Sequence, residues 1–182
     1  MSLQSYNELV KLVEQGVITN VEHDQINAAS IDLTLGDTIL EEVIDMNETS
    51  PIVFLGRRDT LKTRMVKLSS EPYFLSPGRF ILACTEQMFN LPNHISAEYK
   101  LKSSMARIGL EHLNAGYCDA GWHGSVLTLE LKNMTSDHII ALRKGDRIGQ
   151  IVFFTHQGVP KDRSYATRGR YNNDTTVSEI KP

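Results

Sequence analysis

The sequence predicts a mainly β protein built as a sandwich or barrel, with a short helix at its N-terminus. Two observations predict this fold class. From about Ile26 onward, short β-branched and aromatic runs alternate with turn residues, as they do in sandwiches and barrels. Helical periodicity is clear only before Gly16,. The chain has 182 residues, of which 41% are hydrophobic, which is enough for one domain with a core.

The predicted N-terminal helix begins after Ser5 and ends near Gly16. Ser5 and Glu8 have the spacing of a capping box,, and glycine is a common residue just past a helix end. The apolar residues at helical spacing are Tyr6, Leu9, Val10 and Val13. No second helix of comparable clarity is expected.

Six later runs read as β-strands or strand pairs because they are rich in β-branched and aromatic residues. They are 30–37, 51–56, 73–84, 125–133, 138–146 and 147–154. The sequences SPG at 76–78 and KGD at 144–146 are typical of turns between strands. Residues 45–51 are expected to form a loop.

The tail from about Gly158 is polar and lacks periodicity. Such a segment either stays mobile or orders only on a partner or ligand. No internal repeat or domain boundary is visible, so residues 1–182 are expected to form a single domain. Within it, 158–182 is a C-terminal tail that could close over a ligand.

Charge, cysteine spacing and hydropathy exclude several classes of protein. The net charge of −3 predicts no broad basic face for nucleic acid, although a small anion pocket is compatible with it. Cys84 and Cys118 match neither a zinc spacing nor a disulfide framework, which favours a reducing cytosol. No apolar run approaches the roughly 18 residues of a membrane span, and the first residues do not read as a signal peptide. A cytoplasmic protein without membrane contact is therefore expected.

Zinc is not an expected cofactor. The six histidines are scattered, and the HxE…PCxxC arrangement of zinc-dependent nucleobase deaminases is not found.

The run LKSSMARIGL at 101–110 concentrates cations and hydroxyls. Its polar members are Lys102, Ser103, Ser104 and Arg107. Arginine binds phosphate bidentately, lysine binds it as a point charge and serine donates, so the run suits an oligophosphate. One helical turn would aim Ser103, Ser104 and Arg107 the same way. The alternative is a capped turn with a solvated charged face.

The run LNAGYCDAGWHG at 113–124 combines three glycines with Asp119 and the only tryptophan, Trp122. Gly116 and Gly121 permit backbone conformations that bring amides and carbonyls close to a small planar ligand. Asp119 would then be an acceptor and Trp122 an apolar wall. A hairpin loop with Trp122 as a core anchor explains the same residues.

The run LTLELKN at 127–133 reads as a strand that holds one acid, Glu130. Strand alternation places Leu127, Leu129 and Leu131 on one face, and Glu130 on the other,. That second face is either wet or lines a pocket. In a pocket, burial would raise the pKa of Glu130 from about 4.3 towards neutrality, which suits a general base. Gln150, on the later strand at 147–154, could donate to phosphate or pair with backbone.

These motifs together resemble the dCTP deaminase/dUTPase family over nearly the whole chain. INAASIDLTLG at 26–36 resembles an early strand signature of the family. LKSSMARIGL resembles its GRSSLARLGL motif, with Leu101-Lys102 in place of Gly-Arg. DAGWHG at 119–124 and LTLELKN resemble the two motifs that follow, the second of which contains the catalytic glutamate of the deaminases.

The resemblance implies a dUTPase-like fold, a distorted β-barrel or jelly roll that forms a homotrimer with active sites at subunit boundaries. It implies that Glu130 is the general base that activates water for attack on C4 of cytosine. Ser103 and the carbonyl of Ala115 would hold this water, and Arg107 would steady the site and the triphosphate. Mg²⁺ would accompany the triphosphate rather than sit in a protein cage.

The resemblance also implies contacts to the rest of the nucleotide. Asp119 would accept from the 3′-hydroxyl of the deoxyribose, and Trp122 would crowd the sugar so that ribose is rejected. Thr128, Leu129 and Glu130 would present a strand edge to the base. Other implied contacts are Lys102, Ser104, Asn114 and Gln150, with Tyr165, Arg170 and Asp174 in the tail.

Some features are closer to trimeric dUTPases. NAGYCD at 114–119 resembles their uracil-binding hairpin, in which the aspartate activates the water that attacks phosphorus. GDRIGQ at 145–150 resembles their GDRIAQ strand, yet simple dUTPases lack a glutamate at the position of Glu130. Three functions stay open: a dCTP deaminase, with or without cleavage of dUTP to dUMP; a dUTP diphosphatase alone; and a catalytically silent nucleotide-binding trimer. Feedback inhibition by dTTP is left open too.

Overall fold

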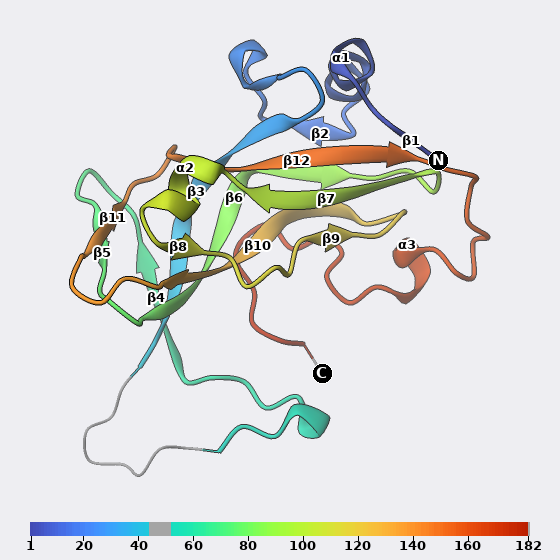
Figure 1. Ribbon diagram of the computed structural model, residues 1–182. Helices are drawn as coiled ribbons and strands as arrows, with labels where there is room; N and C mark the ends of the chain where they lie inside the picture. The colour runs from blue at the N-terminus through green and yellow to red at the C-terminus, as the bar shows by residue number, and fades with distance from the viewer. Residues whose placement is uncertain (44–51, 182) are drawn as a thin grey trace.

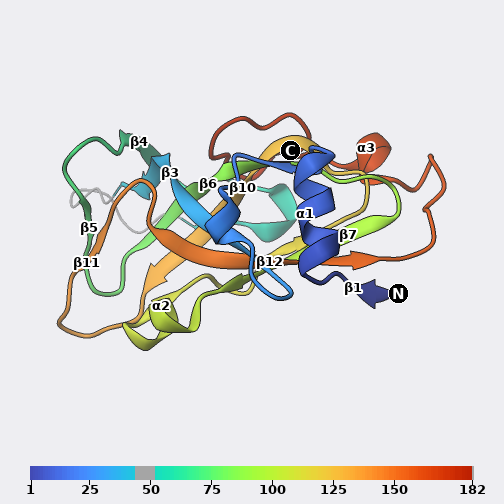
Figure 2. The same cartoon turned by 90° about the horizontal axis from the view of Figure 1, so that it is seen from above.

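The computed structural model describes residues 1–43 and 52–181, and its described part is mainly β (Figure 1). Among these residues, ten strands form one sheet that follows the path β8-β10-β6-β3-β12-β7-β9, and β5 pairs with β11 in a second sheet. The short strands β1, β2 and β4 extend the large sheet beside β12, β6 and β3. The sheet curls on itself, which confirms the predicted barrel-like β fold (Figures 1 and 2).

The described strands are β1 (Ser2–Leu3), β2 (Ile18–Thr19), β3 (Ile31–Glu42), β4 (Thr63–Lys67), β5 (Tyr73–Leu75), β6 (Phe80–Asn90), β7 (Ile95–Leu101), β8 (Leu110–Glu111), β9 (Tyr117–Cys118), β10 (His123–Asn133), β11 (Ile140–Leu142) and β12 (Arg147–Thr155). The described helices are α1 (Tyr6–Glu14), α2 (Ser103–Arg107) and α3 (Tyr165–Arg168), with the 3₁₀ turns η1 (His23–Gln25) and η2 (Leu55–Arg57).

The predicted N-terminal helix is confirmed as α1. Ser5 is its N-cap residue and donates from Oγ to Glu8 Oε2 at 2.6 Å. Leu9 and Leu12 are buried in the main core, and Gly16 follows the helix with a positive φ of 72°. Figure 1 shows β2 between α1 and β12, and the buried side of α1 packs into the main core.

Most predicted strands and both predicted turns are present, but 52–56 is not a strand. This segment belongs to an extension, residues 52–63, which lies below the sheet and contains η2 (Figure 1). Ile52 is 76% exposed, and the guanidinium of Arg57 lies 4.4 Å from the ring centroid of Phe54. A strand forms only where its backbone has a neighbouring strand to pair with. The end of β3 pairs with β4 and not with residues 52–56,. The predicted loop at 45–51 lies outside the described residues.

The tail, for which polar composition predicts either mobility or ordering on a partner or ligand, is packed against the sheet. Val177 is buried in a small apolar cluster with Leu40, Cys84 and Val126. The amide of Val126 donates to the carbonyl of Asp174 at 2.8 Å, and the amide of Asn173 donates to the carbonyl of His123 at 3.0 Å. Polar composition concealed these contacts because they are made mostly by the backbone, which has no sequence signature.

Candidate active site

One cavity of about 540 Å³ lies between β10, the loop after β8, the tail and the extension that contains η2. This volume is typical of small-molecule sites. Seven of the residues predicted from the sequence line it: Ala115, Asp119, Trp122, Thr128, Glu130, Tyr165 and Asp174. The strand, the glycine-rich loop and the tail therefore meet as the sequence motifs suggested.

Glu130 projects from the cavity side of β10 and is largely shielded from solvent. Its neighbours Leu129 and Leu131 are buried in the core on the other face of the strand, as alternation predicts. Burial raises the pKa of Glu130 to about 7, and a hydrogen bond with its own backbone offsets part of this effect. A carboxylate with a pKa near neutrality is suited to take a proton from water at physiological pH.

The backbone of β10 is half open beside Glu130. On one edge, Thr128, Leu129 and Glu130 pair with β6. On the other edge, the β8 pairing involves only Lys132 and Asn133 of β10 among the described residues. The edge at 128–130 can therefore present amides and carbonyls to a planar ligand. This position suits the predicted role of Leu129, whose backbone lies at this edge although its side chain is in the core.

The 113–124 loop brings an acid and an aromatic ring to the same cavity. Asp119 follows β9, and Trp122 is buried with its ring stacked on Phe89 at 5.1 Å between centroids. Trp122 Nε1 donates to the carbonyl of Tyr171 at 2.8 Å. Trp122 is therefore a core anchor and a cavity wall at once, so the two predicted roles are compatible.

The tail supplies further polar lining. Asp174 is held by its backbone between Ser125 and Val126, and its carboxylate pairs with Lys181 Nζ. The other oxygen, Asp174 Oδ2, is buried without a hydrogen-bond partner. A buried unsatisfied acceptor is rare, and this one belongs to a cavity-lining residue. It suits a hydrogen-bond donor on a ligand.

The cavity is acidic. Among the described residues that line it, five are acids and none is lysine, arginine or histidine. The acids are Asp59, Asp119, Glu130, Asp174 and Glu179. A triphosphate bound here would meet carboxylates without compensating cations from the lining, which is unfavourable. Cations for such a ligand must come from elsewhere.

The remaining predicted contacts gather in a second place, around α2. We call Lys102, Ser103, Ser104, Arg107 and Gln150 the α2 group. Its members do not line the cavity. The α2 turn is helical as predicted, and the side chains of Ser103, Ser104 and Arg107 are exposed.

Two members of the α2 group, Lys102 and Gln150, are linked through Asp32 of β3. Lys102 Nζ lies 2.6 Å from Asp32 Oδ1, and Asp32 is the register partner of Gln150. Gln150 Oε1 accepts from Ser30 Oγ at 3.3 Å. Lys102 therefore neutralises a buried acid, a role that the sequence did not suggest. Its phosphate contact stays a prediction.

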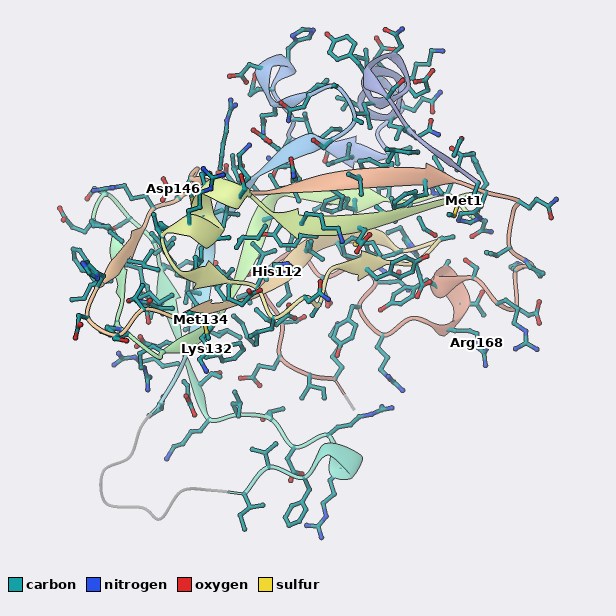
Figure 3. The ribbon with its side chains drawn as sticks, viewed as in Figure 1. Met1, His112, Lys132, Met134, Asp146 and Arg168 are labelled. Atoms are coloured by element: carbon teal, nitrogen blue, oxygen red, sulfur yellow. The ribbon has the colours of Figure 1, made fainter. Side chains whose placement is uncertain are left out.

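The α2 group also lies away from α3 and the tail. In both cartoon views α2 and α3 are at opposite ends of the molecule (Figures 1 and 2). Figure 3 shows the same separation between Arg168 of α3 and Met134, whose amide donates to the carbonyl of Gly109 just after α2. One chain thus holds an acidic cavity and a cationic turn that does not contribute to the lining of that cavity.

Two other predicted residues lie near the cavity without lining it. Asn114 is exposed beside Ala115, with a positive φ of 55°. The side chain of Arg170 is exposed, and its carbonyl accepts from Lys181 Nζ at 3.2 Å. Their contacts to a ligand stay predictions.

Sequence reasoning missed part of the lining. The missed residues are Asp59, Leu61, Thr63, Phe80, Leu82, Tyr117, Cys118, Val126, Leu127, Tyr171, Ser178, Glu179 and Ile180. Phe80 and Leu82 could have been found, because β6 is the long neighbour of the strand with Glu130 and their alternation matches its cavity face,. No sequence pattern indicated the lining residues of the extension or those at the end of the tail. They are Asp59, Leu61 and Thr63 in the extension, and Ser178, Glu179 and Ile180 in the tail.

The described residues contain neither a clustered metal site nor a membrane-spanning helix. No group of three or more His, Cys, Asp or Glu side chains in 1–43 and 52–181 is arranged to hold a metal ion. The five cavity acids are therefore spread along the wall rather than gathered into a cage. No helix in this part of the chain has the length and apolar character needed to cross a bilayer.

Comparison with known proteins identifies the family. The family profile described as dCTP deaminase-like matches residues 3–156. The chain belongs to the dCTP deaminase-like family. A relative from Methanosphaera stadtmanae, named "dCTP deaminase, dUMP-forming", is 34% identical over 100% of this chain and 95% of its own length. One of the same name from Coprothermobacter proteolyticus is 36% identical over 85% of this chain and 81% of its own.

A solved structure supports the fold of this family member. The 2′-deoxycytidine 5′-triphosphate deaminase from Agrobacterium tumefaciens matches with a TM-score of 0.65 and 23% identity. The match covers 83% of this chain and 47% of that longer chain. The tail beyond residue 156 lies outside the matched family profile.

Proposed function

We propose that this protein deaminates dCTP to dUTP and then cleaves dUTP to dUMP and diphosphate. The observation behind the proposal is that Glu130 and Asp119 line one cavity. Each is the acid that one of the two reactions needs. The relatives named as dUMP-forming dCTP deaminases support the same sequence of reactions.

In the first step Glu130 takes a proton from water, and the hydroxide adds to C4 of cytosine. Glu130 passes this proton to N3 of the base, then takes the proton of the new C4 hydroxyl and delivers it to N4. The C4 carbonyl forms, the C4–N4 bond breaks, and ammonia leaves. A glutamate with a pKa of about 7 is half ionised near neutral pH, so it can both accept and return the proton. The carbonyl of Ala115 would hold the water together with the hydroxyl of Ser103 from another copy, because Ser103 does not line the cavity of its own chain.

In the second step a water attacks the α-phosphorus of dUTP, and the bond to the β-phosphate oxygen breaks. Asp119 would take the proton from this water. Its alternative role, as acceptor for the 3′-hydroxyl, needs the same carboxylate in the same cavity. The open edge of β10 at 128–130 would bind the base, and Trp122 would pack against the sugar.

The proposed assembly is a homotrimer with sites between copies. The acidic lining of the cavity supports this, because the triphosphate needs cations that the α2 group of another copy can supply. Arg107 and Ser103 of that copy would then face the phosphates. Ser104 and Gln150 would add hydrogen-bond donors. Mg²⁺ would bind together with the triphosphate and neutralise part of its charge, so a metal site built from protein ligands would not be needed.

The test is incubation with dCTP and Mg²⁺, followed by chromatography of the products. We expect dUMP, diphosphate and ammonia. Release of dUTP alone would restrict the activity to deamination. Conversion of added dUTP while dCTP is untouched would mean a dUTP diphosphatase. Absence of both reactions, with nucleotide binding retained, would mean a silent binding protein. Addition of dTTP to the same assay tests feedback inhibition.

A further inference from the structure

Three segments far apart in the sequence meet at Gly121. Ser164, in the tail, is buried, and its Oγ donates to Asn93 Oδ1 at 2.6 Å. Asn93 lies in the loop between β6 and β7. Ser164 is also the N-cap of α3, since its Oγ accepts from the amide of Ala166 at 3.2 Å. The hydroxyl is therefore satisfied in both directions.

Gly121 leaves the space that this hydrogen bond occupies. A β-carbon at position 121 would lie 2.0 Å from Ser164 Oγ and 2.9 Å from Asn93 Oδ1. Gly121 also has a φ of 90°, a conformation that other residues resist. The tail can dock at this point only because position 121 has no side chain.

The docking point adjoins the cavity. Tyr165 directly follows Ser164, and its amide donates to the carbonyl of Ala120 at 3.0 Å, one residue after Asp119. The side chains of Tyr165 and Asp119 both line the cavity. A second contact follows at Tyr171, whose carbonyl accepts from Trp122 Nε1 and from Ser125 Oγ. The 119–126 segment therefore holds the tail with a backbone carbonyl and with the side chains of Trp122 and Ser125.

We propose that Gly121, Ser164 and Asn93 form a clasp that positions the tail over the cavity, and that they are positioning residues for substrate binding. The part that concerns substrate rests on the function proposed above. The clasp fixes the start of α3, so Tyr165 and the later cavity residues are placed together. Loss of the clasp lowers the fraction of chains whose cavity is complete, and the apparent affinity for nucleotide falls with that fraction.

The test compares two glycine-to-alanine variants, of which only one creates a clash with the tail. Gly121→Ala adds backbone strain and a clash with the tail. Gly78→Ala adds comparable strain, because Gly78 has a φ of 73°, but no atom lies within 4 Å of the place that its new β-carbon would take. Ser164→Ala and Asn93→Ala remove the hydrogen bond, whereas Asn93→Asp keeps an acceptor oxygen for the Ser164 hydroxyl.

The first readout is trypsin cleavage after Arg168, followed by mass spectrometry. Cleavage requires the tail to open, so its rate reports the open population. We expect Ser164→Ala and Asn93→Ala to be cleaved about tenfold faster, as expected for loss of one well-made buried hydrogen bond. Gly121→Ala should be cleaved fastest, with Gly78→Ala and Asn93→Asp like the parent protein.

The second readout is steady-state deamination of dCTP. We expect Gly121→Ala to raise KM about tenfold while kcat changes less than about threefold, because saturating substrate pulls the tail into place. A Gly121→Ala tail cleaved no faster than that of Gly78→Ala would overturn the clasp. Faster cleavage with an unchanged KM would overturn its role in positioning. If the parent protein does not deaminate dCTP, the proposed function fails, and the cleavage rates alone decide whether the clasp exists.

Discussion

The cavity wall on β10 and the α2 turn form two contrasting regions of this molecule. The cavity is lined by five acids and aromatic side chains, and burial there raises the pKa of Glu130 to about 7. The α2 turn has exposed hydroxyls and Arg107. A nucleoside triphosphate needs both regions: a water-poor pocket for the base and cations for the phosphates. Each region thus holds half of the chemistry, and the α2 turn does not line the cavity of its own chain.

The largest effect is expected from Glu130→Gln. The amide keeps the shape of the side chain but cannot take a proton from water, so kcat for deamination should fall at least about 10³-fold. Binding of dCTP should be largely kept, as measured by calorimetry. Turnover at the parental rate would show that the acid of the cavity wall is not the base.

The same substitution should stabilise the fold at alkaline pH. Because the folded state holds the Glu130 proton more tightly, with a pKa of about 7 against an ordinary value of 4.5, the parent protein loses stability as pH rises between these values. Glutamine does not titrate. The variant should therefore gain up to about 3 kcal/mol at about pH 8 and little near pH 5. Denaturant midpoints of the parent and of the variant, taken at the two pH values, measure this gain. If the variant and the parent have equal midpoints at both pH values, Glu130 is not desolvated.

Arg107→Ala tests the cationic region. Loss of a charged donor to phosphate should lower kcat/KM for dCTP by about 10- to 100-fold. Arg143→Ala, which removes another exposed arginine, is the matched control and should leave kcat/KM near the parental value. If kcat/KM is unchanged in Arg107→Ala, the α2 turn is a solvated surface with no role in phosphate binding.

A smaller effect is expected when the chain stops after Ser164. This removes Tyr165, Tyr171 and Asp174 from the cavity lining, so KM for dCTP should rise about tenfold. Loss of buried Val177 should also lower the melting temperature, without unfolding the sheet. A KM that does not move would exclude the tail from the substrate site.

The sequence predicted the two regions unequally well. Strand alternation predicted the orientation of Glu130, and the spacing of Ser103, Ser104 and Arg107 predicted a helical turn. Periodicity cannot say whether a polar strand face is wet, because this depends on the tail and on the 52–63 extension that cover it. The docking of the tail depends on backbone hydrogen bonds and on space left at Gly121, neither of which has a local pattern. Lys102 was recognised as a cation, but its pairing with Asp32 joins residues 70 positions apart.

The most direct test of a site shared between copies is to mix two variants of strongly reduced activity. Chains with Glu130→Gln still hold an intact Arg107, and chains with Arg107→Ala still hold an intact Glu130. If each site joins the cavity of one copy to the α2 turn of its neighbour, dissociation and reassembly of an equal mixture should restore about a quarter of the parental deaminase activity, since that share of sites receives both intact residues. Activity no higher than that of the two variants measured separately would contradict the shared site.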